Sequence, residues 1–78
     1  MPWSAAFDDP IVLRGGRPLQ TLQQAADHIM QLPEDVQHAR HWQTAIETLI
    51  NAAEKGGGWM MFARIAMLRA LNADANRK

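Results

Sequence analysis

The segment from Trp59 to Leu71 constrains the fold more than any other part of the chain, because it is apolar on almost every side. Arg64 and Arg69 are its only charged residues, and three consecutive glycines precede it. A helix that is apolar nearly all round is normally buried, so we expect a helix over residues 59–73 that needs extensive cover. Beside a narrow alanine face, helical spacing gives it two further apolar faces, the first with Met60, Met67 and Leu71 and the second with Met61, Ile65 and Leu68.

The chain is so small that its own residues can hardly cover all the apolar faces of this helix. Its 78 residues correspond to one domain over residues 1–78, and folding a chain this small buries only about 60% of its surface. Without cysteine a disulfide cannot add stability, and a net charge of zero gives little repulsion between copies. We therefore predict a homodimer built on the last helix, with an interface drawn from Met60, Met61, Ile65, Met67, Leu68 and Leu71.

The preceding segment, residues 33–55, has the pattern of an amphipathic helix. Pro33 suits the first turn of a helix, and Glu34 and Asp35 follow it at the positive end of the helix dipole. The glycine triplet at residues 56–58 marks its end. We expect one continuous helix with one apolar stripe, formed by Val36, Ala39, Trp42, Ile46, Leu49, Ile50 and Ala53.

Residues 21–32 are predicted to form the first helix. Thr21 is a favourable N-cap, and Gln24, three residues later, completes a capping box. Pro33 then disfavours helical backbone at Leu32 and ends the helix there.

Residues 10–20 read as a β-hairpin, preceded by a tail at residues 1–9. Two short runs flank Gly15 and Gly16, and a two-residue turn with positive φ at both positions favours glycine. The fold class that we predict is therefore α+β and mostly helical, with an N-terminal two-stranded β-hairpin followed by three α-helices. The turn predicts three cross-strand pairs: Arg14 with Arg17, Leu13 with Pro18, and Val12 with Leu19.

Four short motifs spread over nearly the whole chain resemble a known bacterial family, domain-of-unknown-function family 982. They are Phe7-Asp8-Asp9-Pro10-Ile11-Val12, Thr21-Leu22-Gln23-Gln24-Ala25-Ala26, Leu32-Pro33 and Ala63-Arg64-Ile65-Ala66. The resemblance implies a bacterial protein. It supplies no activity, cofactor or catalytic residue.

Two small groups of side chains are candidates for ligand binding. His38 and His41 lie one helical turn apart, and two histidines with this spacing can ligate zinc; His28 is a distant third candidate. The alternative interpretation is that these histidines are simply exposed to solvent. Arg14 and Arg17 at the predicted hairpin tip are candidate contacts for an anion such as phosphate. Catalysis is poorly provided for, because the chain has no cysteine or tyrosine and no acid–base spacing of note. We predict a protein that is not an enzyme and has no cofactor.

The charge balance and the apolar pattern narrow the classes of partner. Eight basic and eight acidic residues do not favour a nucleic-acid binder, which relies on excess positive charge. The longest apolar run is far shorter than a membrane span, and residues 1–10 lack the features of a signal peptide, so we expect a cytoplasmic protein. Two functional classes remain open. The favoured one is a self-associating protein–protein interaction module; the other is a small regulator that binds a ligand or metal through the histidines or the hairpin arginines.

Overall fold

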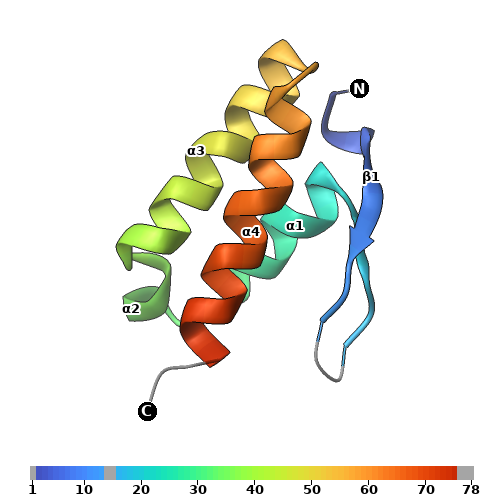
Figure 1. The fold of residues 1–78 in the computed structure, drawn as a ribbon. Coiled ribbons are helices and arrows are strands. Elements are labelled where there is room, and N and C mark those ends of the chain that lie inside the picture. Colours follow the sequence, from blue (N-terminus) through green and yellow to red (C-terminus); the bar gives the residue numbers. More distant parts are fainter. Residues whose placement is uncertain (1, 14–15, 76–78) are drawn as a thin grey trace.

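The computed structural model describes residues 2–13 and 16–75, and it confirms the predicted class: an antiparallel two-stranded hairpin followed by helices (Figure 1). The short helix η1 and strand β1 come first, β2 leads directly into α1, and α2 to α4 complete the chain. The bounds are η1 Pro2–Ser4, β1 Ala6–Ile11, β2 Leu19–Thr21, α1 Leu22–Met30, α2 Glu34–Gln37, α3 Arg40–Lys55 and α4 Trp59–Ala75.

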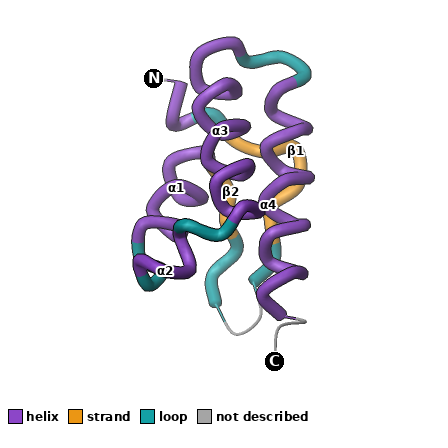
Figure 2. The backbone as a smooth tube through the Cα atoms, turned by 90° about the vertical axis from the view of Figure 1, so that its left-hand side faces the viewer, coloured by secondary structure: helices purple, strands orange, loops and turns teal. Residues whose placement is uncertain are grey.

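The long helices α3 and α4 form the centre of the molecule. They lie side by side and make the most extensive contact between any two elements. α4 also contacts β1, and α1 contacts both α3 and β2, so the hairpin and α1 cover one side of the α3–α4 pair (Figures 1 and 2). The opposite side of α4 has no element packed over it in Figure 1.

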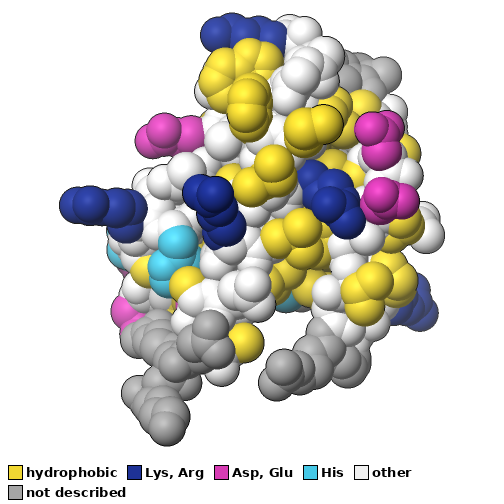
Figure 3. Space-filling view, viewed as in Figure 1, with side chains coloured by type: hydrophobic (Ala, Val, Ile, Leu, Met, Phe, Trp, Pro, Cys, Tyr) yellow, Lys and Arg dark blue, Asp and Glu magenta, His cyan; other side chains and the backbone are white. Residues whose placement is uncertain are grey.

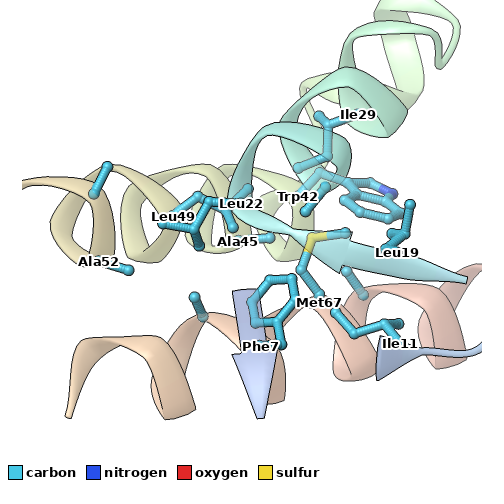
Figure 4. Close-up of a cluster of buried hydrophobic side chains, with 14 residues drawn as sticks. Phe7, Ile11, Leu19, Leu22, Ile29, Trp42, Ala45, Leu49, Ala52 and Met67 are labelled. Atoms are coloured by element: carbon cyan, nitrogen blue, oxygen red, sulfur yellow. The ribbon is translucent and has the colours of Figure 1, made fainter. Parts of the chain in front are cut away.

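The buried side chains form one core between these layers. Strands and helices both contribute, and Met67 points into the cluster from α4 (Figure 4). No buried side-chain nitrogen or oxygen within the described part of the chain lacks a hydrogen-bond partner, as expected for a stable interior. The largest fully buried side chains are Trp42, Ile11, Leu22, Ile29, Leu49 and Met67.

The start of α1 follows the predicted capping pattern. The Thr21 side chain accepts a hydrogen bond from the Gln24 backbone N–H at 3.2 Å. The Gln24 side chain reaches back to accept from the Gln20 N–H at 2.7 Å, one residue earlier than in a standard capping box. Both bonds satisfy backbone donors around the helix start, where the helix itself offers no acceptors.

The hairpin differs from the prediction in extent and register. β1 begins at Ala6, within the predicted tail, and Ile11 rather than Val12 pairs with Leu19. A shift of one residue exchanges the two faces of a strand: Ile11 is fully buried here, whereas Val12 is 76% exposed. The predicted register was therefore wrong. Arg14 of the predicted Arg14–Arg17 pair and Gly15 of the predicted Gly15–Gly16 turn lie outside the described ranges.

The predicted helix over residues 33–55 is in fact two helices. α2 ends at Gln37, and Ala39 has extended backbone (φ −61°, ψ 143°) before α3 begins. Glutamine side chains satisfy backbone carbonyls around the break: Gln37 donates to Leu32 O at 2.7 Å and Gln43 donates to Gln37 O at 2.8 Å. No proline or glycine marks this break, which is why periodicity alone extended the helix through it.

Candidate functional site

The outward side of α4 carries a row of large apolar side chains. Met61 is 63% exposed, Phe62 55% and Ile65 38%, and Leu68 is partly exposed. These four residues are called the α4 outer face below. Apolar side chains lie along α4 in the middle of the view in Figure 3, with charged side chains on both sides. Contiguous exposed apolar surface on a small protein often marks an interaction site.

The structure divides the six residues predicted to form the interface. Met61 and Ile65 lie on the outer face, and Leu68 lies at its edge. Met67 is fully buried in the core of the chain and offers no exposed surface to a second copy. Met60, Leu68 and Leu71 are partly buried and pack against that core. Phe62, which is 55% exposed and lies one turn before Ile65, was not among the six predicted residues.

The reason for the burial of Met67 is the small size of its neighbours on the inner side of α4. Ala63 and Ala70, one turn away on either side, are fully buried with it. Short side chains let two helices approach closely, so α3 packs deep enough against α4 to enclose Met67. The alanine face was recognised in the sequence, but the depth of packing that it permits was not.

An aromatic pair extends the apolar surface at the first turn of α4. The rings of Trp59 and Phe62 meet edge to face with centroids 5.7 Å apart, a preferred geometry for two aromatic rings. The Lys55 ammonium lies 5.4 Å from the Trp59 ring centroid, within cation–π range. These contacts hold Phe62 in place while leaving more than half of it exposed.

Charged residues of opposite sign border the outer face. On the β1 side, Asp8 and Asp9 are exposed, and Arg64 Nε donates a hydrogen bond to the Asp9 carbonyl at 2.9 Å. On the α3 side, Arg40 and Arg69 are exposed. Both arginines line a shallow groove of about 400 Å³ between α3 and α4, together with His41, Thr44 and Ala66.

A polar cluster ties the last turn of α4 to the core. One Asp74 carboxylate oxygen accepts from the buried Trp42 indole N–H at 2.8 Å, and the other lies 2.9 Å from His41 Nε2. The His28 ring centroid is 6.0 Å from that of Trp42. Burial lowers the pKa of His28, and the nearby Asp74 carboxylate partly opposes this shift. The cluster satisfies a buried donor, and this is a structural role.

The three histidines that were the alternative candidate for a ligand or metal site do not gather in the structure. His38 lies at the end of α2, exposed, with Nε2 3.9 Å from Glu34, while His41 lies on α3 beyond the break. Across the described ranges, no three His, Asp or Glu side chains gather as metal ligands would. His28 and His41 both lie beside Trp42 instead.

The predicted anion contacts are only partly visible. Arg17 lines an open groove of about 530 Å³ between the hairpin connection and α1. Asp27 and His28 line the same groove, so an acidic side chain competes there with an incoming anion. Arg14 lies outside the described residues.

Comparisons with protein-family models, with curated proteins and with solved structures found no match. The resemblance to domain-of-unknown-function family 982 stays a prediction based on its four motifs. Among the helices of the described residues, none combines the length and the apolar character needed to cross a bilayer.

Proposed function

We propose that this protein is a non-enzymatic interaction module that self-associates as a homodimer through the α4 outer face, in the cytoplasm. The observation that carries the proposal is the exposure of Met61, Phe62 and Ile65 on a helix whose other side is already packed. A fold that needed only its own core would place polar residues at these positions.

The energetic scale supports burial of this surface by a partner. The three side chains together expose on the order of 300 Å² of apolar surface. Covering it corresponds to roughly 7 kcal/mol per subunit at about 25 cal/mol per Å², before the costs of association. Stable interfaces bury about 1,200–2,000 Å² in total, so the adjoining surfaces of α3 and β1 have to contribute as well.

The test is the molar mass in solution, by light scattering after size exclusion at tens of micromolar protein. We expect a dimer mass for the native chain and a monomer mass for Met61→Glu, because a carboxylate buried without a partner is strongly unfavourable. Met30→Glu is the matched control: Met30 is 74% exposed on α1, away from α4, so this variant should remain dimeric.

Two results would contradict the proposal. A native chain that stays monomeric at this concentration removes self-association altogether. A Met61→Glu variant that still dimerises moves the interface away from the α4 outer face.

A further inference from the structure

The two borders of the α4 outer face carry opposite charge, and these charges are free to engage a partner. Among the described residues, none of the ion pairs within the subunit uses Asp8, Asp9, Arg40 or Arg69. In Figure 3 acidic side chains lie on the β1 side of α4 with a basic side chain beside them, and the α3 side shows basic side chains together with an acidic one. The chain has zero net charge, but the β1 side has two carboxylates to the one guanidinium of Arg64, and the α3 side has two arginines to the one exposed carboxylate of Glu47.

A two-fold axis can stack such a face on itself in two ways. When the two-fold axis lies in the plane of the interface and is perpendicular to α4, the two α4 helices are antiparallel. The acidic border of one copy then faces the acidic border of the other, and the arginines of one copy face those of the other. With the axis along α4, the helices are parallel and the β1 border of each copy faces the α3 border of the other. Like charges brought together across an interface are unfavourable, and opposite charges select the partner and its orientation.

We propose that the dimer is parallel, and that Asp8 and Asp9 of each copy enter the groove between α3 and α4 of the other. This inference rests on the proposed self-association and adds its geometry. The acidic border of each subunit contacts the groove of the other subunit. The dimer therefore has two equivalent charged contacts, one on either side of a central apolar strip.

The groove suits a carboxylate-bearing strand edge. Thr44 and Ala66 are small and leave a depression of about 400 Å³, and Arg40 and Arg69 supply guanidinium groups at its border. Guanidinium groups bind carboxylates through paired, charge-assisted hydrogen bonds. The lining His41 is held by Asp74 at 2.9 Å, so that part of the groove is already ordered.

The acidic border is presented by an equally ordered element. Arg64 Nε binds the backbone carbonyl of Asp9, not its carboxylate. That bond joins β1 to α4 and leaves the side chains of Asp8 and Asp9 exposed. The positive charge of Arg64 lowers the net negative charge of the β1 border but does not reverse it, because this border has two carboxylates and one guanidinium.

Charge reversal tests the arrangement directly. The acid-reversed chain carries Asp8→Lys and Asp9→Lys, the base-reversed chain carries Arg40→Glu and Arg69→Glu, and a fourth chain carries all four changes. In a parallel dimer each partial reversal apposes like charges, so we expect dimerisation about tenfold or more weaker at low salt. The fourfold variant restores opposite charges at both contacts and should recover near-native affinity. Helix content and melting temperature check that each variant folds.

A cross-link reads the direction of the helices independently. Asn72 is exposed near the end of α4, seven residues beyond Ile65, and the chain has no native cysteine. In a parallel dimer of the Asn72→Cys variant, the new cysteine of one subunit should form a disulfide with the new cysteine of the other on mild oxidation. In an antiparallel dimer centred on Ile65 the two sulfurs would lie about 20 Å apart, beyond disulfide reach.

The outcomes separate this inference from the function on which it rests. A monomeric native chain ends both. A native dimer that Met61→Glu disrupts, but that the charge reversals leave unchanged or that Asn72→Cys fails to cross-link, keeps the interaction module and overturns the parallel arrangement.

Discussion

The helices α3 and α4 have nearly the same length, 16 and 17 residues, but they divide their apolar side chains differently. α3 buries one stripe that includes Trp42 and Leu49 and presents mostly polar residues elsewhere. α4 buries a stripe of Ala63, Met67 and Ala70 and is apolar on the opposite side as well. Both helices bury alanines together with larger side chains, Trp42 and Leu49 from α3 and Met67 from α4. Met61, Phe62 and Ile65 of the α4 outer face are exposed and lie outside this core.

The largest effect should come from removing the main α3 contribution. Trp42→Ala deletes the largest fully buried side chain and should lower the free energy of unfolding by about 3–5 kcal/mol. Trp42→Phe keeps most of the volume and loses the hydrogen bond to Asp74, so about 1–3 kcal/mol is expected. Urea unfolding followed by circular dichroism measures both. Equal losses would mean that the hydrogen bond, not the volume, dominates.

A smaller loss of unfolding free energy is expected from substitutions on the two sides of α4, and its size should differ between them. Met67→Ala opens a cavity in the core and should cost about 2–4 kcal/mol of unfolding free energy. Met61→Ala removes a side chain that is mostly in water and should change stability by less than about 0.5 kcal/mol. Chemical denaturation has to be carried out at protein concentrations where the chain is monomeric. Similar losses for both variants would refute the division of α4 into a folding side and an outer face.

The smallest effect is a pH dependence that comes from α1. Burial lowers the pKa of His28 below its usual 6.5, so the unfolded chain takes up a proton more readily than the folded one. The contribution of His28 is fully present above pH 6.5 and is lost as the pH falls toward the lowered folded-state pKa. His28→Gln should therefore reduce the drop in melting temperature between about pH 7.5 and about pH 5.5. A His28→Gln variant whose drop equals that of the native chain would refute the assignment.

Most of the element order could be predicted from local signals. The Thr21 cap, Pro33, the glycine triplet and the helical spacing each act within a few residues, and each marks a real boundary or helix. The hairpin register could not be predicted, because Ile11 and Val12 are equally suited to burial and only the packed helices distinguish them. The break before Ala39 depends on glutamine side chains that reach backbone carbonyls five and six residues away.

The candidate site was predictable in kind but not in detail. The excess of apolar residues on the last helix was visible in the sequence, and it indicated a surface needing cover. Which of these residues belong to the core depends on how closely α3 approaches Ala63 and Ala70, and this is a tertiary property. The contact of Asp74 with Trp42 joins residues 32 positions apart, and no spacing rule links them. The groove bordered by Arg40 and Arg69 likewise exists only once α3 and α4 are packed.

The three tryptophans give the molecule a set of built-in optical probes. The chain has no tyrosine, so its near-ultraviolet emission comes from tryptophan alone. Trp3 lies in the N-terminal turn, Trp42 in the fully buried core beside His28, and Trp59 next to the exposed Phe62. Indole emission shifts with exposure to water, so each ring reports on a different event: anchoring of the N-terminus, closure of the core, and covering of the surface around Phe62. Substituting two of the three at a time by phenylalanine would make these signals separable without attaching a dye.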